Sequence, residues 1–86
     1  MQVTWSDKAI KQRQFWKRIK PKIDSRIQKL VDNIILTPYS GIGKPEPLKH
    51  ELSGFWSRRI DQEHRLVYSF DEKTKTIKIH SCRDHY

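Results

Sequence analysis

The amino-acid sequence predicts an α+β fold, in which two N-terminal helices pack on one face of a small antiparallel sheet. Apolar residues recur at helical spacing in the first half of the chain, whereas apolar and polar residues alternate in the second half. Helices followed by a run of strands are typical of layered α+β domains. Because a chain of 86 residues suits one hydrophobic core, we expect a single domain over residues 1–86.

The first half of the chain is expected to hold a short strand and two helices. Residues 2–5 suit the strand, and Ser6 suits the N-cap of a helix that continues to about Arg18. Lys20–Pro21 interrupts the helical pattern, because proline fits the first turn of a new helix better than its interior. The second helix should end before Thr37–Pro38. Its apolar stripe consists of Ile23, Ile27, Leu30, Val31 and Ile34.

The second half is expected to be a loop followed by strands. Residues 39–47 contain two glycines and two prolines and suit a loop, and residues 48–50 suit the beginning of a strand. Three further strands are expected at residues 55–61, 64–70 and 75–83. Since the helices should cover one face of the sheet, the other face would carry the basic residues.

Alternation along these strands predicts which side chains share a face. Arg58 and Arg59 should point to opposite faces, so that only one of them can reach a shared site. Arg65 should lie on the face away from the apolar Leu66. His80 and Cys82 should lie on one face of the last strand.

The charge of the chain indicates a polyanionic partner. Eighteen Lys and Arg residues stand against ten Asp and Glu, which gives a formal net charge of +8. A field of this sign on a small surface attracts nucleic acid. Neutralisation by an acidic protein partner is an alternative, and one surface could serve both.

The sequence shows no sign of secretion or membrane insertion. Its first residues lack the basic and apolar segments of a signal peptide, and no stretch approaches the ~20 apolar residues of a membrane span. The lone Cys82 excludes an intramolecular disulfide and suits a reducing compartment. We therefore expect a soluble, cytoplasmic protein without membrane contact.

The residue types present would be sufficient for cleaving RNA without a metal. The 2′-hydroxyl is the nucleophile, and the enzyme supplies a base, an acid for the leaving 5′-oxygen, and cations for the phosphorane. Glu46, His85 and nearby arginines could fill these roles. The ordinary alternative is that Glu46 is a solvated loop residue and that His85 and Tyr86 form a frayed end.

Two other kinds of site were weighed. His80, Cys82 and His85 fall within six residues, but no second cluster at zinc-like spacing accompanies them, so no metal site is expected. Aromatic side chains could stack on RNA bases. Trp5, Phe15 and Trp16 suit the core, whereas Phe55, Trp56 and Tyr86 could serve either purpose.

Three long segments of the sequence closely resemble the YoeB (Txe) toxins of the RelE-like superfamily. They are GKPEPLKH at residues 43–50, LSGFWSRRI at residues 52–60 and EHRLVY at residues 63–68. The C-terminal CRDHY and the early Trp5–Ser6 fit the same pattern. The turn over residues 71–76 is longer than in the family pattern.

This resemblance implies a toxin of a type II toxin–antitoxin system with a RelE-like, microbial-ribonuclease-type fold. It implies a ribosome-dependent endoribonuclease that cuts mRNA in the ribosomal A site without a cofactor and inhibits translation. A YefM-like antitoxin would neutralise it, operator DNA would be bound only within the toxin–antitoxin complex, and a homodimer is possible.

By the same resemblance, the general base falls on Glu46, phosphate stabilisation on Arg65 and the general acid on His85. Tyr86 completes the catalytic set, and the RNA-binding residues in support are Lys49 and Arg59. Lysines close to Glu46 would weaken it as a base, so two roles stay open for it: proton acceptor, or orientation of the 2′-hydroxyl.

Two functions of other classes compete with the enzyme. A non-catalytic RNA- or ribosome-binding module would block translation by occupancy, and it would not require the acid–base set Glu46 and His85. A DNA-binding repressor would require a recognition helix, for which the sequence shows no signature.

Overall fold

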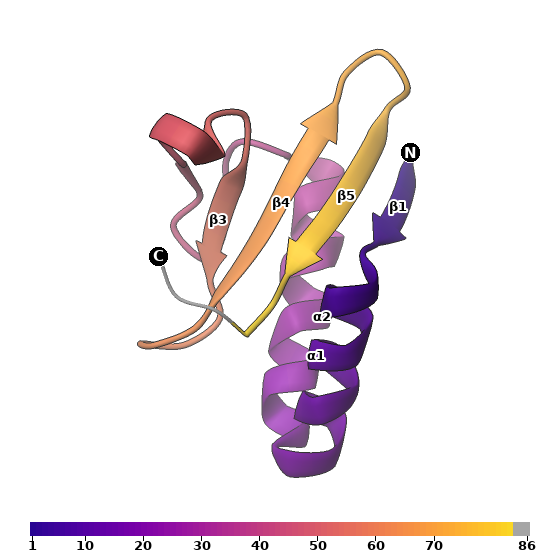
Figure 1. Cartoon of the computed structure of the whole chain (residues 1–86), viewed down its shortest axis with the longest axis vertical. Coiled ribbons are helices and arrows are strands. Elements are labelled where there is room, and N and C mark those ends of the chain that lie inside the picture. The colour runs from indigo at the N-terminus through magenta and orange to yellow at the C-terminus, as the bar shows by residue number, and fades with distance from the viewer. Residues whose placement is uncertain (84–86) are drawn as a thin grey trace.

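The computed structural model describes residues 1–83 and shows two helices packed on one face of a five-stranded sheet (Figure 1). In chain order the elements are β1 (Gln2–Trp5), α1 (Asp7–Ile19), α2 (Pro21–Leu36), β2 (Glu46–Pro47), the 3-10 helix η1 (His50–Leu52), β3 (Trp56–Arg59), β4 (Arg65–Asp71) and β5 (Thr76–Ser81). The strands lie in the order β1-β5-β4-β3-β2. The α+β class predicted from the sequence is confirmed.

The two helices begin and end where local chemistry predicts. The Ser6 hydroxyl accepts a hydrogen bond from the Ala9 amide at 3.0 Å and caps α1. Pro21 occupies the first turn of α2, where the missing N–H costs no helical hydrogen bond. The backbone of Thr37 closes the end of α2 by donating to the Asn33 carbonyl at 2.9 Å.

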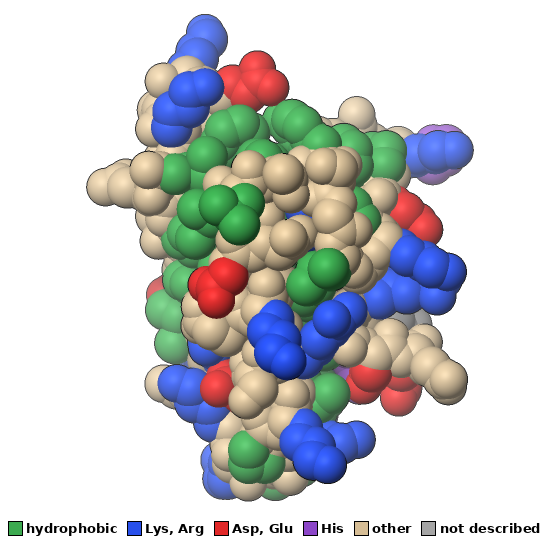
Figure 2. Space-filling model, turned by 180° about the vertical axis from the view of Figure 1, so that it is seen from behind, with side chains coloured by type: hydrophobic (Ala, Val, Ile, Leu, Met, Phe, Trp, Pro, Cys, Tyr) green, Lys and Arg blue, Asp and Glu red, His purple; other side chains and the backbone are tan. Residues whose placement is uncertain are grey.

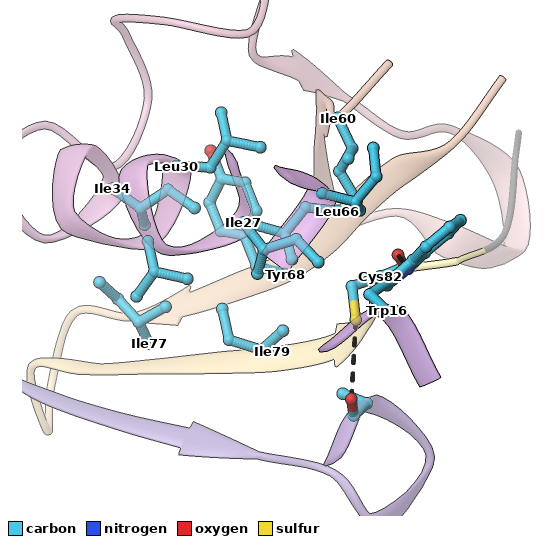
Figure 3. Close-up of a cluster of buried hydrophobic side chains, with 13 residues drawn as sticks. Trp16, Ile27, Leu30, Ile34, Ile60, Leu66, Tyr68, Ile77, Ile79 and Cys82 are labelled. Atoms are coloured by element: carbon cyan, nitrogen blue, oxygen red, sulfur yellow. Dashed lines mark hydrogen bonds between the residues drawn. The ribbon is translucent and has the colours of Figure 1, made fainter. Parts of the chain in front are cut away.

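The core lies between α2 and the central strands (Figure 3). The predicted stripe of α2 is buried, and Ile27, Leu30 and Ile34 have no exposed surface. They pack against the buried side chains of Leu66, Tyr68, Ile77 and Ile79. Each buried aliphatic side chain contributes about 1.5–3 kcal/mol to stability, so this contact fixes the helices on one face.

The sheet is mostly antiparallel, with one exception. β1 runs parallel to β5, with Val3 opposite Ile77, whereas all other strand pairs are antiparallel. Parallel neighbours need a long crossover connection. Here the two helices and the intervening strands supply it.

The segment before β3 differs from the prediction. Residues 48–50 do not begin a strand: the short strand β2 comes earlier, and η1 follows it. His50 has a φ of 59°, which is incompatible with an extended strand. The segment instead closes into a loop in which the Leu48 amide donates to the Phe55 carbonyl at 2.8 Å. Three residues of sequence were too few to distinguish these alternatives.

A β-bulge in β5 overturns the prediction that His80 and Cys82 share a face. Tyr68 lies opposite Ile79, but the preceding residue of β4, Val67, lies opposite Ser81. His80 is therefore an extra residue in β5. A bulge shifts the alternation of side chains beyond it. Cys82 therefore belongs to the core, whereas the ring of His80 lies on the other face against Phe55.

The sequence predicted that basic residues would lie on the face away from the helices. They are not confined to that face. Figure 2, which views the helical side, shows Lys and Arg side chains spread over it. Both helices carry exposed lysines, for example Lys11 and Lys29. Positive charge is therefore present on the helical side as well. Within residues 1–83, no helix is long and apolar enough to cross a membrane.

Candidate functional site

The face of the sheet that points away from α1 and α2 (Figure 1) is here called the open face. Among the predicted site residues, it carries Glu46, Arg59 and Arg65. Residues in register across neighbouring strands share a face, so Ser57 lies beside Val67, and Ser69 lies beside Lys78. The open face carries Ser57, Arg59, Arg65, Val67, Ser69, Lys78 and His80, with Glu46 at its β2 edge. No helix of the described chain covers it.

Glu46 and Arg65 meet on the open face, although they are nineteen positions apart in the chain. The Arg65 Nη1 lies 3.8 Å from the Glu46 Oε2 and donates a hydrogen bond of 3.4 Å to the Ser57 hydroxyl. Glu46 is opposite Ser57 in the β2–β3 pairing. The Arg65 side chain is 18% exposed and that of Glu46 is 52% exposed. A carboxylate and a partly desolvated guanidinium thus lie together where a ligand could reach both.

A tight turn before β2 presents Glu46. Gly43 has a φ of 81°, and a Cβ on it would lie 2.7 Å from the Leu30 Cδ2. The Gly43 carbonyl accepts a hydrogen bond from the Arg59 amide at 2.7 Å. Only glycine combines this backbone conformation with so close an approach to the core. The turn therefore joins the Glu46 segment to β3 and α2.

Arg58 is buried on the helical side and makes no contact with the open face. Its guanidinium donates to the Asn33 Oδ1 at 2.5 Å and to the carbonyls of Thr37, Ser40 and Ile42 at 2.6, 2.9 and 3.1 Å. Since α2 has no basic residue in its last turn, this guanidinium supplies the positive charge that a helix C-terminus favours. The expected division between Arg58 and Arg59 is confirmed: Arg58 is structural, and Arg59 is exposed.

Tyr68 extends the same buried network. Its hydroxyl accepts from the Arg58 Nε at 3.1 Å and donates to the Pro38 carbonyl at 2.6 Å. Burial raises the pKa of Tyr68, and the hydrogen bond from Arg58 opposes that shift. Together these side chains fasten residues 37–42, the segment that leads to the Glu46 turn.

The end of the described chain is anchored close to Arg65. Ser81 is opposite Val67, so in an antiparallel pair the chain beyond Ser81 runs toward the level of Arg65. The Trp16 indole donates to the Cys82 carbonyl at 2.8 Å, the His64 Nδ1 contacts the Arg83 carbonyl, and the Arg83 guanidinium lies over the Phe15 ring. The predicted residues His85 and Tyr86 lie outside the described residues.

The two predicted supporting cations are both exposed. Lys49 precedes η1, and Arg59 ends β3 opposite Arg65. Neither makes a side-chain ion pair among residues 1–83. Both can therefore reach an anionic ligand without losing an ion pair to any residue of the described chain.

The aromatic residues that the sequence left ambiguous separate in the structure. Trp56 packs on the helical side against Tyr39, with ring centroids 4.9 Å apart. Phe55 lies on the open face, with its ring centroid 4.4 Å from that of His80. Burial lowers the pKa of His80 below its ordinary value, and Lys78 nearby adds to that shift.

Sequence reasoning missed several residues that shape this site. Ser57 links Arg65 to the β2 edge. His64 makes an edge-to-face contact with Trp16, with ring centroids 4.9 Å apart, and also contacts the Arg83 backbone. Asn33 accepts hydrogen bonds from both Arg58 and the Ile42 amide. A polar residue beside the apolar stripe, close to the end of a predicted helix, was the signal available for Asn33. Nothing local marked the other two.

Two further features were tested as alternative sites. Among residues 1–83, no group of three or more His, Cys, Asp or Glu side chains could hold a metal ion. A shallow cleft of about 230 Å³ is smaller than the ~300–1,000 Å³ of typical ligand pockets. It lies on β1 and α1, away from Glu46 and Arg65, and is lined by Trp5, Ile10, Arg13, Gln14 and Lys17.

Comparison with known proteins gives a consistent result over the whole chain. A family model described as "YoeB-like toxin of bacterial type II toxin-antitoxin system" matches residues 5–86. The chain is 44% identical over 86 residues to "Toxin YoeB" of Escherichia coli (strain K12), and the match covers both chains in full.

Solved structures show the same similarity in three dimensions. A "YoeB/ParE toxin from Agrobacterium tumefaciens" superposes with a TM-score of 0.96 at 38% identity, with both chains fully covered. A Staphylococcus aureus protein at 40% identity was solved as a heterotetrameric YoeB–YefM toxin–antitoxin complex, with a TM-score of 0.89, and as a YoeB dimer, with a TM-score of 0.91. Each match covers 100% of this chain and 98% of that one.

Proposed function

The chain belongs to the YoeB-like toxins of bacterial type II toxin–antitoxin systems, and from that premise we propose that it is an endoribonuclease. Residues 1–86 act as one toxin domain. It cuts mRNA in the ribosomal A site of the bacterial cytoplasm and so inhibits translation. The observation that carries this proposal is the meeting of Glu46 and Arg65 on the open face, 3.8 Å apart.

The chemistry assigned to this pair is transfer of the phosphoryl group to the neighbouring 2′-oxygen. Glu46 accepts the 2′-hydroxyl proton, or orients that hydroxyl, as the 2′-oxygen attacks phosphorus. Arg65 stabilises the charge that grows on the phosphorane oxygens. Because Arg65 is only 18% exposed, its charge is less screened than that of a surface arginine. No step requires a metal ion or other cofactor.

His85 protonates the leaving 5′-oxygen in this proposal, and Tyr86 completes the site. The support for this role of His85 is the short length of chain that separates it from Arg83. His85 is two residues beyond Arg83, whose backbone contacts His64, and two extended residues span at most about 7 Å. The chain from Arg83 can therefore bring His85 to the Arg65 end of the open face. Lys49 and Arg59, both exposed, would bind flanking RNA phosphates.

The partners proposed are those of the Staphylococcus aureus relative, together with the substrate. A YefM-like antitoxin would neutralise the toxin, as the YoeB–YefM complex suggests, and a homodimer has a precedent in the YoeB dimer. The net charge of +8 suits an acidic antitoxin segment as well as ribosomal RNA. Operator DNA would be bound only by the toxin–antitoxin complex.

Mapping cleavage ends in a translation reaction with purified ribosomes and defined mRNA tests this function. We expect a cut in the A-site codon, a 2′,3′-cyclic or 3′-phosphate on the upstream fragment, and a 5′-hydroxyl on the downstream fragment. A 5′-phosphate would exclude 2′-hydroxyl attack. Arrested ribosomes carrying intact mRNA would instead identify a non-catalytic blocker.

A further inference from the structure

Phe55 lies on the open face and does not pack against the hydrophobic core. Its neighbour Trp56 packs with Tyr39 on the helical side, and Phe70 borders the same group at 6.0 Å from Tyr39. The Phe55 ring lies against His80 instead, and both side chains are partly exposed. Because both rings are partly exposed on the same face as Glu46, part of this aromatic pair is accessible to a ligand.

Hydrogen bonds fix the backbone of Phe55 and the ring of His80. The Phe55 amide donates to the Leu52 carbonyl at 3.0 Å, and its carbonyl accepts from the Leu48 amide at 2.8 Å. The bulge in β5 lies at His80, and the His80 Nε2 is hydrogen-bonded to the Ser69 hydroxyl at 3.0 Å. Bulges commonly re-aim a side chain next to an active site. Little conformational entropy would therefore be lost when a ligand stacks here.

The pair lies close to the proposed catalytic residues Glu46 and Arg65. Phe55 is two residues before Ser57, the residue that lies opposite Glu46 and accepts a hydrogen bond from Arg65. Two residues of a strand span about 7 Å. On the other side, the exposed Lys78 is opposite Ser69 in the β4–β5 pairing. The Phe55 and His80 rings, tilted by 45° to one another, thus lie on the open face between Arg65, which is proposed to bind phosphate, and the exposed Lys78.

We propose that Phe55 and His80 form a stacking site for the base of an RNA nucleotide next to the bond that is cut, with Lys78 contacting an adjacent phosphate. The proposal rests on the endoribonuclease function and names the substrate contact that positions the scissile bond. Stacking on rings without hydrogen bonds to base edges tolerates all four bases. The site therefore contributes affinity and register rather than base specificity.

The first experiment measures binding without cleavage. A fluorescein-labelled oligoribonucleotide carries a single 2′-deoxy substitution at the cut position, so that no nucleophile is present. We expect Phe55→Leu to weaken binding about 5- to 150-fold with an unchanged salt dependence, because base stacking is apolar. Phe55→Trp should bind at least as tightly as the wild type. Lys78→Met should make the salt dependence less steep, by about 0.7 in the log–log slope.

The second experiment identifies the stacked base. An abasic position is moved along the same oligonucleotide and combined with Phe55→Leu in double-mutant cycles. At one position next to the cut, the abasic substitution should weaken wild-type binding but have little effect on Phe55→Leu. Any of three results would overturn the proposal. Phe55→Leu could bind as tightly as the wild type, Phe55→Leu and Phe55→Trp could lose the same affinity, or the effects of the abasic substitution and of Phe55→Leu could be additive at every position.

Two controls keep the result interpretable. Thermal unfolding of each variant checks that the fold is retained. Because the oligonucleotide cannot be cut by 2′-hydroxyl attack, the binding result is independent of the end-mapping experiment. If the binding experiment shows no stacking but the cleavage products carry a 5′-hydroxyl, the endoribonuclease assignment stands without the stacking site. If stacking is found but the mRNA stays intact, the protein binds RNA without cutting it.

Discussion

The helix-covered face and the open face of the sheet both carry arginine with oxygen acceptors, but they use these groups differently. On the covered face, Arg58 donates to Asn33, Tyr68 and three carbonyls at 2.5 to 3.1 Å, and it is completely buried. On the open face, Arg65 has a 3.4 Å hydrogen bond and a 3.8 Å ion pair. Saturated donors stabilise the fold, whereas loosely engaged ones are available to a ligand.

The adjacent residues Arg58 and Arg59 show the same difference within one strand. Side chains alternate along β3, so neighbouring residues of the same type enter opposite environments. Burying a guanidinium is costly unless all of its donors are used, and the end of α2 provides the acceptors for Arg58. Arg59 keeps its charge in solvent, where a phosphate can reach it.

The largest expected effect is on the open face. Glu46→Gln should reduce mRNA cleavage by about 10²–10⁴-fold, because the amide cannot accept a proton in the transition state. The midpoint of urea unfolding should stay close to that of the wild type, since the Glu46 side chain is 52% exposed. Single-turnover cleavage by ribosome-bound toxin measures the effect. Wild-type cleavage by Glu46→Gln would exclude Glu46 as the proton acceptor and leave only the orienting role, which Glu46→Ala would then test.

The next largest effect should come from the covered face. Arg58→Met should lower the free energy of unfolding by about 3–5 kcal/mol, since the three carbonyls that accept from its buried guanidinium lose their donors. The matched control is Arg59→Met, which should change stability by no more than about 0.5 kcal/mol. Urea denaturation followed by tryptophan fluorescence compares them. Equal stability of the two variants would contradict the division between the faces.

A smaller effect is expected from single lysines. Lys49→Met should reduce the slope of log affinity against log salt by about 0.7, because one phosphate contact is lost. Lys29→Met is the matched control on α2, where we expect no direct contact with RNA. Titrations of the same oligoribonucleotide at several salt concentrations measure both slopes. Should the two variants behave alike, net charge rather than the open face would govern binding.

The smallest effect concerns His80 and pH. Its folded-state pKa lies below the ordinary value of 6.5, so its contribution to stability is complete above that pH. As the pH falls below it, the unfolded chain takes up the proton first, and the free energy of unfolding should decrease. Urea denaturation at pH 7.5 and 5.5 should show a larger decrease for the wild type than for His80→Gln. An identical pH dependence would mean that His80 titrates as it does in the unfolded chain.

The sequence by itself determined the α+β class, both helices, the sequence family and the alternation that separates Arg58 from Arg59. These features depend on local signals: the Ser6 cap, Pro21, the spacing of the stripe along α2 and the period of two in the strands. Such signals act over a few residues, so they can be read without knowing the fold.

Only the tertiary structure decided which distant residues meet and which face each aromatic ring enters. The contact of Glu46 with Arg65 depends on the register of two strand pairs, and the position of His80 depends on a bulge that shifts the alternation of β5. Register and bulges result from packing across strands, not from the preferences of single residues. For the same reason, the sequence showed that Phe55 and Trp56 are aromatic, but only packing separated the ring on the open face from the ring that packs against the core.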